Sequence, residues 1–122
     1  MMRLLGQILL AIIFIEGGAD AFVRPGGRVK TVADANLPAI LPNPKTAVEL
    51  NGAAMVIGGS MLALDMAPKL AAAGLFASLL PATLVGHAFW KVEDEAARKA
   101  QQTQFAKNLG LLGGLLLVIV QK

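Results

Sequence analysis

The sequence predicts an all-α integral membrane protein, a four-helix antiparallel bundle. Hydrophobic residues make up 56% of the 122 residues, and the mean hydropathy is +0.64. A helix needs about 20 consecutive, mostly apolar residues to cross a bilayer. The apolar residues form four long blocks that reach or approach this length, at residues 4–22, 47–64, 70–90 and 105–120.

The four blocks and their connections use almost the whole chain, so we expect one transmembrane domain over residues 1–122. The first three blocks are long enough to span a bilayer, and the fourth is short. Residues 91–104, which precede the fourth block, are charged but contain no glycine or proline. We therefore expect a helix there as well, either extending the third span or leading into the fourth.

The other two connections differ in kind. Residues 65–69 form a tight connection that contains Pro68, a residue suited to the first turn of a helix, so the second and third spans form a hairpin. Residues 23–46 contain several prolines and glycines and should be irregular, apart from a short amphipathic turn over residues 29–37 at the membrane surface.

Composition excludes several classes of function. The chain has no cysteine, which rules out disulfides, thiolate nucleophiles and zinc-thiolate sites. The net charge of +3 is spread over several connections without a long run of like charges, so we expect no nucleic-acid partner. We also expect no catalytic residue, no metal site and no evident cofactor in a chain that is nearly all span.

The distribution of lysine and arginine predicts an orientation in the cell membrane. Eight of the 11 basic residues lie on the side of the two long connections, which places these connections in the cytoplasm and both termini outside. The sequence Ala19-Asp20-Ala21 has the form of a signal-peptidase site. Glu16 and Asp20 crowd it, so we expect the first block to be retained as a span.

The polar residues inside the spans gather in one leaflet. With four antiparallel spans, the long connections share one side of the membrane, and the polar residues flank them. They are Glu16, Asp20, Glu49, Asn51, His87 and Asn108. The opposite leaflet has almost nothing polar beyond Gln7 and Ser60. An ionisable side chain inside a span costs free energy and usually faces the interior of the bundle or a water-filled cavity.

This cluster supports two interpretations, to which we give equal weight. Glu16, Glu49, Asn51, His87 and Asn108 are candidates for a ligand site, in which carboxylates and an imidazole would accept and donate protons. The same residues could instead form a structural polar network that locks four thin helices together, with Asn108 as an interhelical hydrogen-bond linker.

Small residues predict close helix packing. Gly110 and Gly114 form a G-x-x-x-G motif in the fourth span, and Gly52 and Gly58 lie along the second. Gly17 follows Glu16 in the first span and offers a further close approach. Such patterns let helix backbones meet. We expect packing within the bundle, with contact between copies of the chain as a lesser alternative.

Four stretches of the chain resemble the DoxX family of small four-span bacterial membrane proteins. They are Phe14-Ile-Glu-Gly17, Val48-Glu49-Leu50-Asn51-Gly52 with Gly58, His87-Ala-Phe-Trp90, and Phe105 to Gly114. The resemblance implies an association with quinol oxidases, thiosulfate:quinone oxidoreductase or membrane oxidoreductase assemblies that handle oxidative stress.

Nearly every residue lies in a span or a connection and no set of cofactor ligands is visible, so the chain is expected to be an accessory subunit of a larger membrane complex, without turnover of its own. The resemblance implies that this complex is a respiratory or oxidoreductase one. The partners of the chain would be the lipid bilayer and other membrane subunits. The alternative is a membrane protein that binds a quinone or lipid at the polar site. Because the chain lacks cysteine, a thiol relay or persulfide step cannot occur on it.

Overall fold

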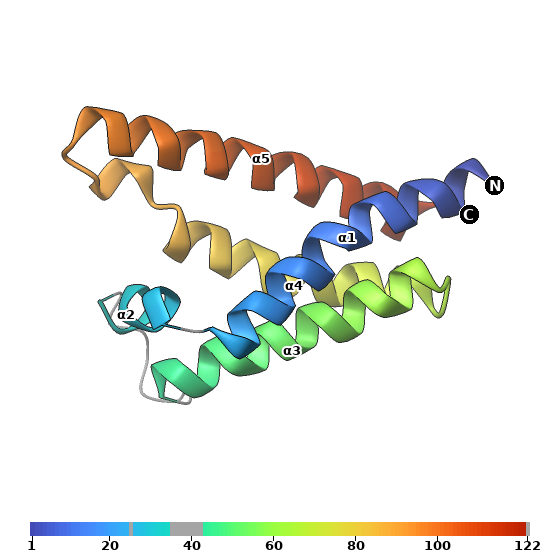
Figure 1. Ribbon diagram of the computed structural model, residues 1–122. Coiled ribbons are helices and arrows are strands. Elements are labelled where there is room, and N and C mark those ends of the chain that lie inside the picture. Colours follow the sequence, from blue (N-terminus) through green and yellow to red (C-terminus); the bar gives the residue numbers. More distant parts are fainter. Residues whose placement is uncertain (25, 35–42, 122) are drawn as a thin grey trace.

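The computed structural model describes residues 1–24, 26–34 and 43–121, and confirms an all-α bundle over these ranges. Six helical elements follow one another along the chain (Figure 1). They are α1 (Met2–Val23), α2 (Gly26–Asp34), α3 (Pro44–Ala63), α4 (Pro68–Gly86), the 3-10 helix η1 (Phe89–Lys91) and α5 (Glu95–Val120). The predicted surface turn at 29–37 falls partly within α2, and its last residues lie outside the described ranges.

Four segments of the described chain are long and apolar enough to cross a membrane, namely α1, α3, α4 with η1, and α5. Each contains or closely overlaps one of the predicted apolar blocks. α5 is longer than the apolar block at residues 105–120 because most of the charged segment before that block is also helical. α5 begins after Asp94, whose side chain accepts a hydrogen bond from the backbone N–H of Ala97 at 2.9 Å.

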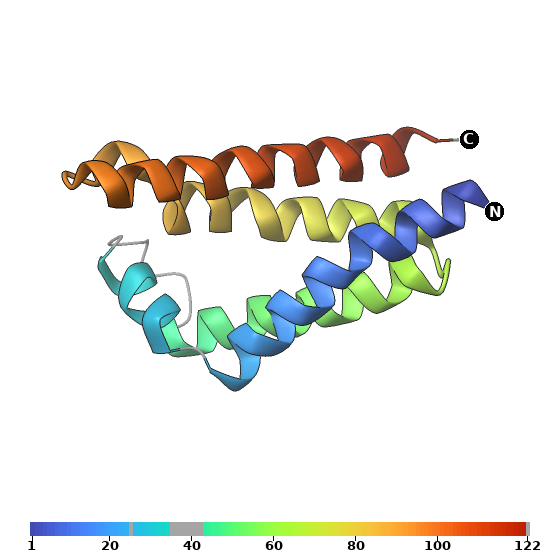
Figure 2. The same ribbon diagram turned by 45° about the horizontal axis from the view of Figure 1, so that its top comes forward.

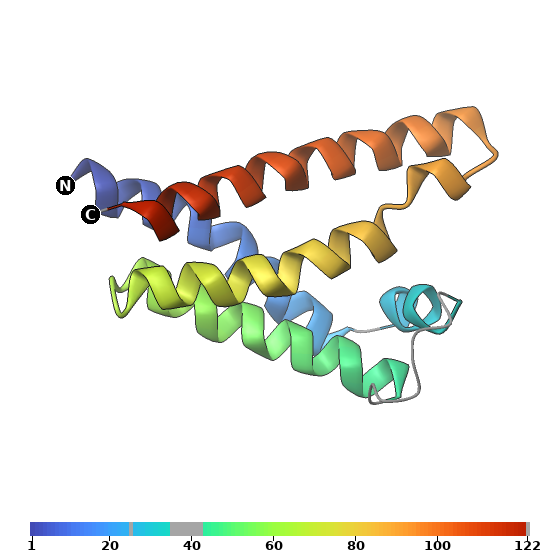
Figure 3. The same ribbon diagram turned by 180° about the vertical axis from the view of Figure 1, so that it is seen from behind.

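The four long helices form two pairs joined by a hairpin. α1 packs along α3, α4 packs along α5, and the tight α3–α4 turn links the pairs (Figures 2 and 3). α1 and α5 lie close at the end that holds both chain termini and diverge toward the other end. α2 lies at this diverging end, against α3 and α4.

The apolar core lies where the two pairs meet. Its largest fully buried apolar side chains are Phe14, Leu62, Leu75 and Leu115, one from each long helix. Each helix thus gives one side to the core, whereas its other sides carry exposed large apolar residues. Such an apolar exterior is what the lipid tails of a bilayer solvate.

α1 and α3 approach through glycines. A Cβ atom on Gly52 would stand 2.6 Å from Gly18 O, and one on Gly59 would stand 2.8 Å from Ile15 Cγ1. Gly58 meets α4 in a similar way, with Leu75 Cδ2 at 3.0 Å. The predicted packing roles of Gly52 and Gly58 therefore correspond to close contacts, and Gly18 is a further glycine at the tightest point.

The other glycines proposed for packing have more room. A Cβ atom on Gly17 would be 3.7 Å from Met55 Cε, and one on Gly114 would be 3.5 Å from Leu10 Cδ1, both ordinary contact distances. Gly110 has no atom within 4 Å of such a Cβ. The G-x-x-x-G motif of α5 therefore makes no close backbone contact with the described part of the bundle.

Candidate functional site

Glu16 lies on the side of α1 that faces away from α3. The residues of α1 that are buried against the bundle are Gln7, Ala11, Phe14, Gly18 and Ala21, and at 100° per residue Glu16 falls on the opposite side of the helix. Its side chain is exposed and makes no hydrogen bond or ion pair with the residues that the structure describes.

One turn further along α1, Asp20 is paired. Its two carboxylate oxygens accept hydrogen bonds from Arg24 Nη1 and Arg28 Nη1, each at 2.9 Å. All three side chains are at least 40% exposed, so the ion pairs contribute little to stability. The cluster ties the end of α1 to the start of α2 and marks the polar end of the span.

Glu49 and Asn51 lie near the start of α3 but have different surroundings. Glu49 is half-buried and has no hydrogen-bond partner within the described ranges. Asn51 Oδ1 accepts a hydrogen bond from Ser78 Oγ of α4, and its Nδ2 lies 3.5 Å from Met55 Sδ. Asn51 therefore links α3 to α4, whereas Glu49 bonds to none of the residues that the structure describes.

His87 lies at the C-terminal end of α4 and contacts α5. Its Nδ1 is 2.7 Å from Gln101 Oε1. An amide oxygen only accepts hydrogen bonds, so this contact requires a proton on Nδ1. Beside the pair, Phe89, Trp90 and Phe105 form three edge-to-face contacts with ring centroids 5.3 to 5.8 Å apart.

Asn108 joins the two helices of the second pair. The residue is buried, with 6% exposure, and its Nδ2 donates to Thr83 Oγ1 at 3.0 Å. The Thr83 hydroxyl in turn donates to the backbone oxygen of Leu79 at 2.7 Å. This chain of bonds fixes α5 against α4 in the way expected of an interhelical linker.

Within the described residues, the five predicted site residues do not form one hydrogen-bonded network. Asn51, His87 and Asn108 each bond to a different side chain of a neighbouring helix, while Glu16 and Glu49 bond to none of the described residues. Within the described ranges, no fully buried side-chain polar atom is left without a hydrogen bond, and no three histidine, aspartate or glutamate residues are grouped as a metal ion would need.

The sequence profile of the DoxX family matches residues 2–88, more than half of the chain. The chain belongs to the DoxX family. No curated protein and no solved structure matches it. Four of the predicted site residues of this DoxX protein, from Glu16 to His87, lie in the matched range, whereas Asn108 and the stretch from Phe105 to Gly114 lie beyond it.

The DoxX chain has a second polar cluster, at the opposite end of the bundle, that sequence reasoning missed. Gln7 is 1% exposed, and its Nε2 donates to Leu62 O and to Asp65 Oδ1, both at 3.0 Å. Gln121 Nε2 donates to Gln7 Oε1 at 3.2 Å, and Arg3 Nη2 pairs with Asp65 Oδ2 at 3.3 Å. This cluster, which we call the Gln7 node, ties α1, the α3–α4 turn and the end of α5 together.

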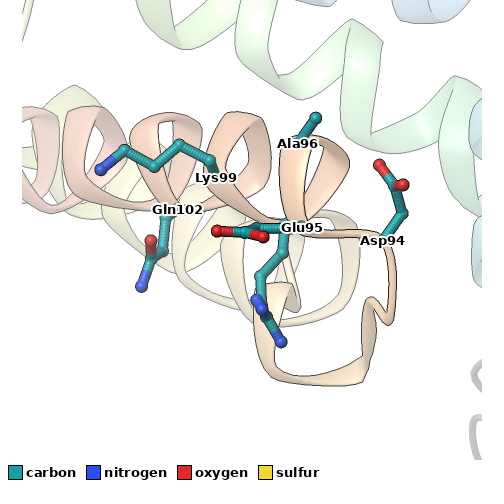
Figure 4. Close-up of a pocket in the computed structure, with 6 residues that line it drawn as sticks. Asp94, Glu95, Ala96, Lys99 and Gln102 are labelled. Carbon is teal, nitrogen blue, oxygen red and sulfur yellow. The ribbon is translucent and has the colours of Figure 1, made fainter.

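The first turns of α5 carry an open hollow of about 790 Å³ on the surface (Figure 4). Its lining is Asp94, Glu95, Ala96, Arg98, Lys99 and Gln102. These side chains carry charges of both signs and are exposed. None of the predicted site residues contributes to this hollow.

Proposed function

We propose that this DoxX-family membrane protein is a non-catalytic subunit of a larger membrane assembly, one that performs respiratory or other oxidoreductase chemistry. Hydrogen bonds between side chains of neighbouring helices support the absence of a catalytic role in this proposal. Asn51, His87 and Asn108 use their polar groups to hold neighbouring helices. Such hydrogen bonds between helices are typical of packing in membrane proteins.

The observation that carries the proposal is the position of Glu16. It is an exposed carboxylate inside a span, on the outside of the bundle, with no partner among the described residues. Ionisable groups in spans pair with one another or with backbone groups and seldom face lipid. A neighbouring protein that covers α1 would supply the missing partner.

The test is extraction of the tagged protein from its native membrane with a mild detergent, and in parallel with a lipid-retaining polymer. Native electrophoresis and mass spectrometry then show whether other membrane proteins accompany it in a fixed ratio. We expect co-migration with oxidoreductase subunits under both conditions. Recovery of the chain alone under both conditions would refute the subunit proposal.

The second candidate function is binding of a quinone or lipid headgroup. Glu49 favours it, because a half-buried carboxylate near the start of α3 is free to accept a proton or a hydrogen bond. His87 would be the second contributing residue. Under this proposal, membranes carrying Glu49→Gln or His87→Ala should lose quinol oxidation at normal protein levels, and unchanged oxidation would count decisively against it.

We further propose that the protein lies in a bacterial cell membrane with its termini outside and its long connections in the cytoplasm. The basic residues support this orientation, since Arg24 and Arg28 lie at the end of the bundle away from both termini. Labelling of cysteines introduced singly at Met2 and Glu93, with a reagent that does not cross membranes, tests it. Only the residue-2 variant should react in intact cells.

A further inference from the structure

One side of α1 is an apolar surface that ends in two carboxylates. Leu5, Leu9, Ile12 and Glu16 recur at helical spacing on the side away from α3, and all four are exposed. Leu9 is 62% exposed and Ile12 is 56% exposed. Asp20 follows Glu16 by one turn on the same side and is paired with Arg24 and Arg28. We call Leu5, Leu9, Ile12 and Glu16 the outer face of α1. An apolar face of this kind suits lipid tails, but the carboxylate in it does not.

The depth of Glu16 makes lipid an unfavourable neighbour. Asp20, which is held by two arginines, marks the polar end of α1. Glu16 lies one turn further in, about 6 Å along the helix axis, and roughly 10 Å from Val23. A glutamate side chain is too short to bring its carboxylate across that depth as readily as a lysine or arginine does.

The geometry points to a transmembrane helix of a partner protein that packs along the outer face of α1 and places a lysine or arginine opposite Glu16. This inference rests on the proposed role as a subunit and names the surface and the chemistry of the contact. Charge complementarity selects a cation, and the apolar residues on the N-terminal side of Glu16 select an apolar stretch of helix next to that cation. Leu5, Leu9 and Ile12 would pack against that helix.

A second copy of the chain fits this face poorly. A two-fold contact through the outer face would bring Glu16 against Glu16, and two carboxylates at one site disfavour each other's charged forms. Lys107 is the one basic residue inside an apolar block. Its Nζ donates to Gln104 Oε1 at 2.7 Å, one turn toward the polar end of α5, and so is directed away from the core of the span.

Photo-crosslinking in the full chain tests the contact. A benzophenone amino acid replaces Leu9 or Ile12 on the outer face, and in a control it replaces Leu117, which is exposed on α5. We expect the probes on α1 to crosslink to one membrane protein, at a peptide from a span that contains lysine or arginine. We expect the probe at residue 117 not to reach that peptide. Crosslinks from residues 9 and 12 to lipid only, or to a second copy, would overturn the inference.

Charge variants supply the second measurement, the amount of partner that co-purifies per chain. Loss of one member of a desolvated charge pair lowers affinity by at least about tenfold, so Glu16→Gln should reduce the recovered complex to that extent and Glu16→Asp should retain most of it. Glu93→Gln, in an exposed connection, is the matched control and should change nothing. The thermal midpoint of each purified variant should match that of the wild type, since Glu16 makes no hydrogen bond or ion pair with the described part of the chain.

The outcomes separate the two proposals. If the wild-type chain is recovered alone, both the subunit role and the docking surface are refuted. If a complex is recovered but Glu16→Gln leaves it intact and the α1 probes reach only lipid, the subunit role stands and the outer face of α1 is not the contact.

Discussion

Gly18 in α1 and Gly52 in α3 lie in direct backbone contact. A Cβ atom on Gly18 would stand 2.6 Å from Gly52 O, and one on Gly52 would stand 2.6 Å from Gly18 O and 2.9 Å from Phe22 N. These neighbours are backbone atoms of a helix, so they cannot turn aside as the end of a flexible side chain can. The α1–α3 pair therefore depends on the absence of a side chain at both positions.

Substitution Gly52→Ala should force α1 and α3 apart. We expect a loss of stability of about 1–3 kcal/mol, the usual cost of overpacking, measured by thermal or SDS unfolding in detergent with Trp90 fluorescence as the signal. Gly110→Ala is the matched control, because nothing lies within 4 Å of a Cβ at that position. Equal effects at the two positions would contradict the close approach.

The bond from Asn108 to Thr83 should show a measurable coupling. In a double-mutant cycle of Asn108→Leu and Thr83→Val, we expect a coupling free energy between about 0.5 and 2 kcal/mol, the range for interhelical hydrogen bonds in membrane proteins. The control cycle combines Asn108→Leu with Thr103→Val. Thr103 is an exposed threonine whose hydroxyl donates to Lys99 O. That cycle should give no coupling, and similar values for both would speak against the bond.

Gln7→Leu should loosen the end of the bundle that holds both termini. The substitution leaves Asp65 and Gln121 without the amide that they share in the structure. We expect a loss of about 1–3 kcal/mol, because the three hydrogen bonds of Gln7 are lost and each contributes about 0.5–1.5 kcal/mol. Faster hydrogen exchange over the last turn of α5 should accompany it. Ser60→Ala, a polar deletion in the same half of the bundle, should have a much smaller effect on both.

Removal of the α5 N-cap should shorten that helix. Asp94 accepts a hydrogen bond from Ala97 N, and its charge lies at the positive end of the helix dipole. Asp94→Ala should lower stability by about 1 kcal/mol, with loss of exchange protection confined to the first turn of α5. The neighbouring Glu93→Ala should leave the exchange protection of the first turn unchanged. An equal loss of protection in Glu93→Ala would show that negative charge near the helix end, and not the hydrogen bond from Ala97, protects this turn.

The spans were predictable because length alone identifies them. An apolar block such as residues 4–22 has to be helical in a bilayer, whatever its neighbours are, and α1 covers all of it. The helical segment before the fourth block was predictable from the absence of glycine and proline in it. The family was recognisable from four short stretches, of which His87 to Trp90 and Phe105 to Gly114 are the most specific. The match over residues 2–88 confirms the family, although most of these two stretches lies beyond it.

Which side of each helix faces the bundle was not predictable. A block that is apolar on all sides carries no periodic signal to orient it, so nothing in the sequence tells that Glu16 faces outward and Gly18 inward. Gly17 and Gly18 are neighbours, and only the rotation of α1 selects the second for contact with Gly52.

The polar partners were missed for a related reason. Ser78 and Gln101 are unremarkable in the sequence and become linkers only because Asn51 and His87 face them. The Gln7 node combines one residue inside a span with Asp65 and Gln121, which lie outside the apolar blocks. Gln7 is the one polar side chain in the N-terminal half of the block at residues 4–22, a signal that could have drawn attention to that end of the bundle.

The Gln7 node also constrains the order in which the protein can be built. Gln7 enters the membrane early in synthesis, and Leu62 O and Asp65 become available to its amide only once the α3–α4 turn has been made. The donor to Gln7 Oε1 is Gln121, which is synthesised 114 residues later. α1 and α3 can therefore associate during biogenesis, but the bundle closes at this end only after the last helix has inserted.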